Sequence, residues 1–200
     1  MKMALKKEIL GIVIIMILVT ATSITIIETV AVFSPPLIVL DYLCIMRNLN
    51  SSVTRNALRS MFDRNYNFTE LYQWEHKHVK FINTGESFER SSDPLRILQV
   101  QKGRCGEFSI LYVALCLAHG YEARLALAVD VSCQVFWIQE HNFAEVKIGN
   151  NWTHVDPSDQ VWNQTSHYAE WPWGKTLGSA SRIYAFEEGK ATEVTQTYRI

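Results

Sequence analysis

The feature that most constrains the fold of this chain is a segment over residues 105–119 that would be apolar on every side of a helix. One side of that helix carries Phe108, Leu111, Tyr112 and Leu115, and the other carries Ile110, Val113, Ala114 and Leu117. A helix without a polar face is a core helix, so other elements must cover it all round. Gly120 fits its C-terminal cap.

The elements expected around this core helix come in a simple order. Three helices are predicted before it: from Ser51 or Ser52 to Asp63, from Thr69 to about Gly85, and from Asp93-Pro94 to Gly103. Strand-like segments follow it over 123–129, 141–148 and 152–156, and one or two more are expected within 179–198. Helices first and strands later predict an α+β fold with an antiparallel sheet.

The first forty residues differ from the rest. Three lysines, Lys2, Lys6 and Lys7, precede an uncharged apolar run over 9–27. About 20 apolar residues span a bilayer as a helix, and flanking lysines favour a cytoplasmic N-terminus. We therefore expect residues 1–40 to form a single-pass membrane anchor and residues 41–200 to form an external domain. The alternative is a cleaved signal peptide and a secreted protein, although the apolar run is longer than the usual h-region of about 7–15 residues.

Composition excludes several classes of partner and cofactor. The net charge of −1 gives no reason to expect a nucleic-acid partner. The four cysteines (Cys44, Cys105, Cys116 and Cys133) include no CxxC pair, which argues against a zinc ribbon or a thioredoxin-type site. His76 and His78 would face different directions on a helix, so they make a poor metal pair. No metal and no cofactor is predicted.

The four Asn-x-Ser/Thr sequons, at Asn50, Asn67, Asn151 and Asn163, are compatible with an external domain.

Cys105 stands where a glycine-containing loop, GRCGEF (103–108), becomes the core helix. A helix N-terminus favours the thiolate form of a cysteine, and Arg104 would add to this effect if it pointed toward the sulfur. His141 and Asp156 follow on strand-like segments. A thiolate nucleophile, an imidazole base and a carboxylate that orients the imidazole form a known catalytic combination. The first helical N–H groups would stabilise an oxyanion.

A count along the hairpin tests whether His141 and Asp156 can meet. If Gly149 and Asn150 are the two loop residues, Asp156 lies level with Phe143, and His141 is its diagonal neighbour on the same face. A three-residue loop would instead put Asp156 on the wrong face. His154 shares the strand parity of Asp156 and is the rival base.

Other residues have structural interpretations. Cys116 and Cys133 are interpreted as small buried hydrophobes. His119, beside Gly120, is typical of a helix C-terminus. Trp171 and Trp173 are either packing residues or the lining of a groove for a sugar or a peptide.

Several of these segments together resemble the transglutaminase-like superfamily and, within it, the peptide:N-glycanases. The segments are DPLRILQVQKGRCGEF (93–108), YEARLALA (121–128), HNFAEVKIGNNWTHVDPS (141–158) and WGKTLGSASRIYAFEEGKATEVTQTY (173–198). The chain differs from the family pattern at Phe108 and Phe143, where tryptophans are usual, and in having no CxxC zinc module before Cys105.

The resemblance implies a papain-like α+β core with Cys105 as nucleophile, His141 as general base and Asp156 as its orienting partner. It implies a cysteine-dependent amidohydrolase that acts on a peptide, protein or glycoprotein through a thioacyl intermediate. The amide is either a glycosyl-asparagine or a peptide or glutamine amide, and acyl transfer to an amine is an open outcome. The alternative is a non-catalytic cell-surface module of the same fold that binds glycans or peptides.

Overall fold

The computed structural model describes residues 38–62, 64–82, 86–130, 139–158, 161–162 and 181–198. The chain divides into two units, Met1–Asp41 and Tyr42–Ile200, and apart from residues 38–41 the elements described below belong to the second. The predicted anchor lies outside the described residues up to position 37, so it stays a prediction. Among the described helices, none is long and apolar enough to cross a membrane.

Two helices begin at the predicted capping residues, Ser51 and Asp93, whereas the helix predicted from Thr69 begins at Phe68 with Asn67 as its N-cap. Residues 38–50 are helical, and α2 (Ser52–Ser60) follows with Ser51 as its N-cap. In α3 (Phe68–His78), Asn67 and Glu70 close a reciprocal capping box, which satisfies two backbone N–H groups. α4 (Pro94–Val100) has Asp93 as N-cap and proline in its first turn, as expected. α5 (Cys105–Ala118) is the predicted core helix.

Three helices end earlier than predicted. The second was expected to run to about Gly85, but α3 ends at His78, because Val79 is extended and β1 (Lys80–Phe81) pairs in parallel with β2 (Lys102–Gly103). α4 ends at Val100 because Gln101 takes a left-handed conformation with φ 52°. α2 ends at Ser60, before the predicted Asp63. Each early stop is a backbone change that the apolar pattern did not indicate.

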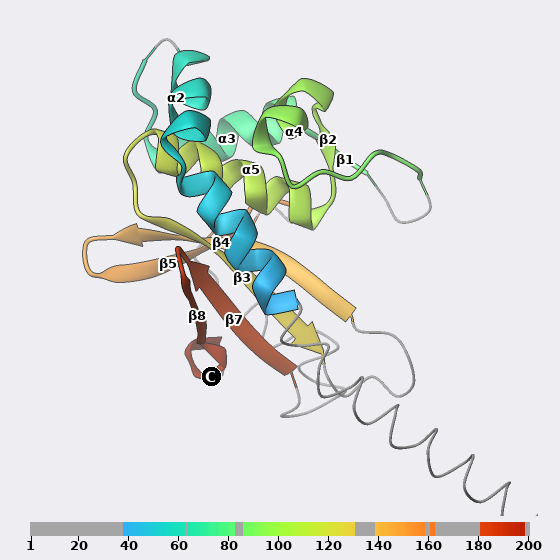
Figure 1. Cartoon of the computed structure of the whole chain (residues 1–200), viewed down its shortest axis with the longest axis vertical. Coiled ribbons are helices and arrows are strands. Elements are labelled where there is room, and N and C mark those ends of the chain that lie inside the picture. The colour runs from blue at the N-terminus through green and yellow to red at the C-terminus, as the bar shows by residue number, and fades with distance from the viewer. Residues whose placement is uncertain are drawn as a thin grey trace, which may run out of the picture. The chain divides into compact units, whose positions relative to one another are not determined.

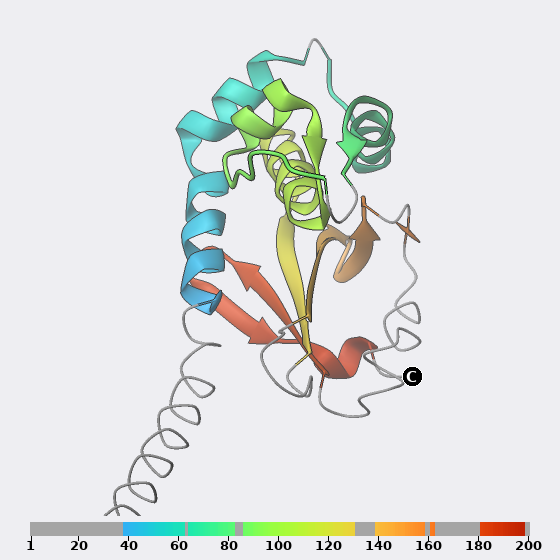
Figure 2. The ribbon, with the colours of Figure 1, turned by 90° about the vertical axis from the view of Figure 1, so that its right-hand side faces the viewer.

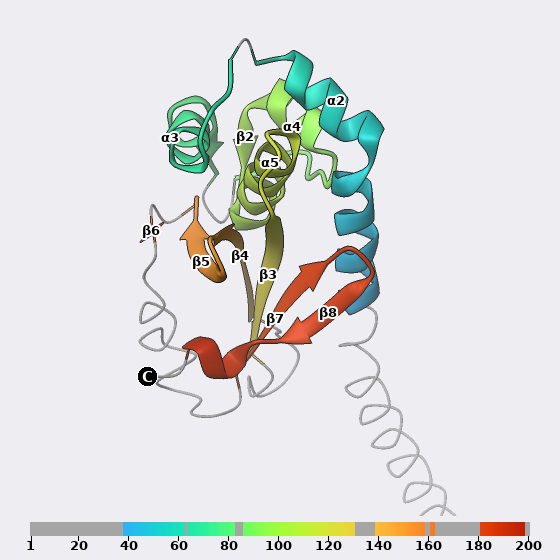
Figure 3. The ribbon, with the colours of Figure 1, turned by 90° about the vertical axis from the view of Figure 1, so that its left-hand side faces the viewer.

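α5 is buried along its length except at its two end residues, as its composition requires. Every residue from Gly106 to Leu117 is buried. Helices α2, α3 and α4 pack against one side of α5, and strands β3 and β4 pack against the other. Figure 3 shows α5 between α3 and α2, with the sheet below it. Gly120 ends the helix as predicted, since it follows the C-cap residue His119 and has φ +84°.

The sheet has six described strands in the order β6-β5-β4-β3-β7-β8, with every neighbouring pair antiparallel (Figure 1). They are β3 (Ala123–Asp130), β4 (Gln139–Ile148), β5 (Asn151–Asp156), β6 (Val161–Trp162), β7 (Ser181–Glu187) and β8 (Lys190–Glu193). The predicted α+β class with an antiparallel sheet is therefore confirmed. The 3-10 turn η2 (Thr195–Tyr198) follows β8, and Figure 2 shows it at the other end of the sheet from α5.

Candidate active site

Local packing around Gly103 places Cys105 at the first position of α5. A side chain at Gly103 would put its Cβ 2.5 Å from the Cβ of Glu107, so only glycine fits there. Glu107 is buried, and its carboxylate accepts the backbone N–H of Arg104 at 3.0 Å. This contact closes the helix N-terminus immediately before the thiol, which is itself only partly exposed.

The β4–β5 hairpin places His141 and Asp156 together. Ile148 pairs with Asn151 across the two-residue loop, as predicted, and the paired register continues to Ala144 opposite Val155. Gly149 has φ +61° while Asn150 does not have a positive φ, which is typical of a type II′ turn. The next step of this register brings Asp156 level with Phe143. His141 Nε2 lies 2.5 Å from Asp156 Oδ2, so the diagonal contact forms.

Asp156 is fully buried and is held from its other oxygen. Oδ1 accepts hydrogen bonds from the backbone N–H of Ser158 at 3.0 Å and from its hydroxyl at 2.7 Å. A carboxylate fixed on one side can orient an imidazole on the other. Because Nε2 of His141 faces this carboxylate, Nδ1 is the ring nitrogen left for the thiol.

Cys105 and His141 change each other's pKa. Burial raises the pKa of the Cys105 thiol, but hydrogen bonds with His141 and Asn142, and the charge of His141, outweigh burial and lower it overall. Burial lowers the pKa of His141, but hydrogen bonds with Asp156 and Cys105 raise it to about 10. Both shifts favour a thiolate beside an imidazolium, which is the nucleophilic form of a cysteine–histidine pair.

The other candidate residues do not join this cluster. His154, the rival base, is buried and packs its ring against Phe143 at 5.0 Å and Tyr198 at 5.9 Å. The guanidinium of Arg104 donates to the carbonyl of Glu86 at 2.9 Å and lies over the Phe88 ring.

The structure describes only some of the residues for which the sequence suggested a structural role. Cys116 is buried in α5, as expected. His119 is the C-cap residue of α5 and contacts the carbonyl of Leu115 at 2.9 Å. The ring of His78 stacks on Trp74, and among the described residues no three His, Cys, Asp or Glu side chains could hold a metal ion. Cys133, Trp171 and Trp173 lie outside the described residues.

Three residues near the thiol, Asn142, Tyr42 and Arg90, were not predicted from the sequence. Asn142 lies beside Cys105 and lowers the pKa of its thiol, and the hydroxyl of Tyr42 donates to the Asn142 amide oxygen. Arg90 is paired with the buried Glu107 at 2.9 Å, and its charge interacts with Cys105 and Glu140. Strand parity argues against Asn142, because consecutive strand residues point to opposite faces. No sequence signal connects Tyr42 or Arg90 to the thiol.

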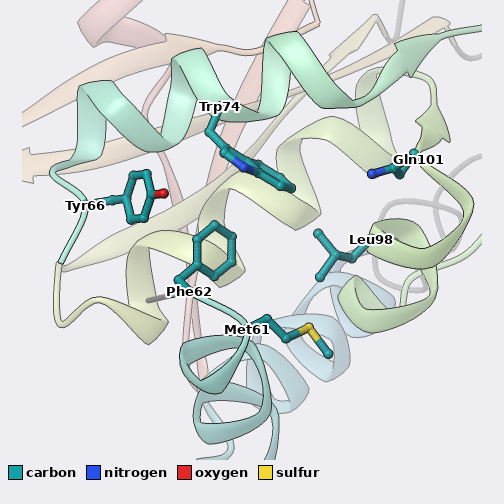
Figure 4. Close-up of a pocket in the computed structure, with 6 residues that line it drawn as sticks. All are labelled: Met61, Phe62, Tyr66, Trp74, Leu98 and Gln101. Carbon is teal, nitrogen blue, oxygen red and sulfur yellow. The ribbon is translucent and has the colours of Figure 1, made fainter. Parts of the chain in front are cut away.

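A separate pocket of about 440 Å³ lies among the helices, away from this cluster. Figure 4 shows its lining from α2 through α4, namely Met61, Phe62, Tyr66, Trp74, Leu98 and Gln101. None of these residues contributes to the cluster of Cys105, His141 and Asp156.

Comparison with known families matches more than half of the chain. Residues 47–157 match the model of the transglutaminase-like superfamily. Curated relatives include peptide-N(4)-(N-acetyl-beta-glucosaminyl)asparagine amidases. The protein from Arabidopsis thaliana is 28% identical over 143 residues, which cover 72% of this chain and 18% of that protein. The protein from Oryza sativa is 31% identical over 121 residues, which cover 60% and 24%. The chain thus spans about a quarter or less of the length of these two relatives.

Comparison with solved structures supports the fold alone. The crystal structure of Rad4–Rad23 bound to a 6-4 photoproduct UV lesion superposes with a TM-score of 0.60. The superposition covers 84% of this chain and 48% of the other chain, at 10% sequence identity. A likeness at this identity reports shared architecture and not shared activity.

Proposed function

We propose that this chain, which belongs to the transglutaminase-like superfamily, is a cysteine-dependent amidohydrolase that acts through a thioacyl intermediate. The observation that carries the proposal is the contact chain from the Cys105 thiol through His141 to the buried Asp156. A thiol that lay in the core only for packing would need neither an imidazole partner nor a fixed carboxylate behind it.

In the first half of the reaction, the Cys105 thiolate attacks the amide carbonyl carbon and a C–S bond forms. The carbonyl oxygen becomes an oxyanion, which N–H groups at the start of α5 can stabilise. The imidazolium of His141 then donates its proton to the leaving nitrogen, and the C–N bond breaks. Ammonia or an amine leaves, and the acyl group remains on sulfur.

In the second half, neutral His141 takes a proton from water, and the resulting hydroxide attacks the thioacyl carbon. The C–S bond breaks, the carboxylic acid product leaves, and the thiolate–imidazolium pair is restored. Asp156 keeps the imidazole in the required tautomer in both halves.

For the substrate, we propose the amide that joins an N-glycan to asparagine, because the curated relatives are named for that reaction. Hydrolysis would release a glycosylamine and leave aspartate in the peptide. A peptide or glutamine amide is the competing substrate, and an amine could replace water as the acceptor. A binding module without catalysis is the competing function, and the assembled cluster counts against it.

The test compares wild type with Cys105→Ala on a denatured glycopeptide and on the same peptide without the glycan. We expect wild type alone to convert glycosylated asparagine to aspartate, and in heavy-oxygen water the new carboxylate carries the label. Cys44→Ser is the matched control, since Cys44 is an exposed cysteine. Equal absence of turnover in wild type and Cys105→Ala on both peptides would refute the enzyme.

For location, we propose a single-pass membrane protein with the domain outside, because lysines precede the uncharged run over 9–27. Secretion after cleavage is the alternative. Full-length protein that stays in membranes after alkaline extraction, with its domain open to external protease, would support the anchor. A mature protein that lacks the N-terminal apolar run and is recovered from the medium would support secretion.

A further inference from the structure

Asn142 is a buried amide beside the nucleophile. Only 3% of its surface is exposed, and its backbone and side-chain amide groups lower the pKa of the Cys105 thiol. Its Nδ2 atom also faces the first turn of α5, because a Cβ built on Gly106 would lie 3.6 Å from it. The glycine after the nucleophile therefore leaves room for this amide.

Tyr42 determines which end of the amide faces the thiol. The Tyr42 hydroxyl donates a hydrogen bond to Oδ1 of Asn142, so the NH₂ end is the one directed at sulfur. Burial raises the pKa of Tyr42, which keeps the hydroxyl protonated and able to donate. The Tyr42 ring is held in turn by stacking on Phe186, with ring centroids 4.8 Å apart and planes 26° apart.

We infer that Asn142 Nδ2 is a catalytic hydrogen-bond donor to the reacting centre, and that Tyr42 is the positioning residue that aims it. The inference rests on the proposed function, since it concerns the same thiol. Asn142 exchanges no proton and forms no covalent bond. As Cys105 attacks, negative charge moves from the sulfur to the carbonyl oxygen of the substrate. An N–H donor beside the sulfur can stabilise the charge at both positions.

The orientation of the amide matters because its two ends have opposite effects. An NH₂ group stabilises both the thiolate and the oxyanion, whereas a carbonyl oxygen in its place would repel them. The charge of Arg90 also interacts with the thiol, and Glu140 interacts with Arg90 and Tyr42. The guanidinium of Arg90 is already paired with Glu107. The uncharged amide of Asn142 is therefore the donor that we place beside the sulfur.

Two readouts on full-length protein test the inference. The first is the rate of iodoacetamide alkylation of Cys105 against pH, which needs no substrate. The second is kcat and KM on the denatured glycopeptide. For Asn142→Ala we expect kcat to fall by about 10²–10³ with little change in KM, and the alkylation midpoint to rise by about one pH unit or more. For Tyr42→Phe we expect changes in the same direction but smaller, with about a tenfold loss in kcat.

Tyr184→Phe is the matched control for the tyrosine change. Tyr184 also packs beside Phe186, with ring centroids 6.5 Å apart, but its hydroxyl accepts a hydrogen bond from Arg182 at 3.5 Å. We expect it to leave both readouts at the wild-type level. Tyr42→Phe keeps the stacked ring and removes one hydroxyl, so it remains informative even if Asn142→Ala does not fold.

The two proposals can fail separately. If wild type does not process the glycopeptide but both variants raise the alkylation midpoint, the substrate is wrong and the Asn142 donor stands. If wild type is active and both variants keep the wild-type kcat and midpoint, the donor is wrong and the proposed function stands.

Discussion

Replacing Asp156 with asparagine should remove most of the catalytic activity while leaving the structure of the site intact. The side chain is fully buried, with Oδ1 held by Ser158 and Oδ2 beside Nε2 of His141 at 2.5 Å. In Asp156→Asn, the backbone N–H of Ser158 requires an acceptor, so the amide oxygen should keep that place. The amide NH₂ group then faces His141.

This exchange forces the wrong tautomer on the imidazole. Nε2 must accept a hydrogen bond from the new amide, so the ring proton moves to Nδ1, the nitrogen that faces the thiol. The imidazole can then no longer take the proton of Cys105, and the imidazolium loses the carboxylate that raises its pKa. Where an amide replaces the orienting carboxylate in this way, kcat falls by about 10⁴, or about 5.5 kcal/mol in the barrier.

The assay combines kcat on the glycopeptide with the pH dependence of Cys105 alkylation. In wild type, the reactive thiolate–imidazolium pair should persist from the lowered pKa of Cys105 up to the raised pKa of His141, about 10. In Asp156→Asn the alkylation midpoint should move up, toward that of a free thiol. Ser158→Ala is the control, because it keeps the carboxylate and should cost about tenfold or less. Wild-type kcat and an unmoved midpoint in folded Asp156→Asn would refute this reasoning.

Three further predictions concern stability. Glu75 is fully buried, its carboxylate oxygens have no hydrogen-bond partner among the described residues, and burial raises its pKa well above the usual value. The folded state therefore binds the proton of the Glu75 carboxyl more tightly than the unfolded state does, so the unfolding free energy of wild type should fall as pH rises above about 4.5. Glu75→Gln should not show this fall. The same pH dependence of the unfolding free energy in both proteins would contradict the prediction. Gly103→Ala should lower the unfolding free energy by about 1–3 kcal/mol in urea titrations, because its Cβ would overlap Glu107. In wild type, the Arg124 guanidinium lies 2.6 Å from the buried Glu145 carboxylate, so Arg124→Ala leaves a buried charge without its partner. It should lower the unfolding free energy by about 3–5 kcal/mol, and a loss below 1 kcal/mol would argue against a buried charge there.

Much of the site could be predicted because its parts depend on short-range rules. A helix N-terminus favours a thiolate wherever the helix packs, and GRCGEF marks such a start. The two-residue loop at Gly149 determines the pairing of β4 with β5, and strand alternation then brings His141 to Asp156. These relations involve neighbours along the chain, so counting residues is enough to find them.

The same rules were insufficient where the backbone changes direction. The helix predicted to continue past His78 ends there, because the next residues pair with a strand that lies just before Cys105. That pairing joins segments distant in sequence. A periodic apolar pattern continues through such a break and does not reveal it.

The sequence by itself determined the core helix, the thiol at its start, and the hairpin that presents an imidazole backed by a carboxylate. Only the tertiary structure decided what surrounds the thiol. Asn142 lies on the face that strand parity disfavours, and Tyr42 and Arg90 come from segments well before α5. The physical reason is that periodicity acts between near neighbours, whereas these contacts depend on how α5 packs on the sheet and which distant side chains fill the space beside it.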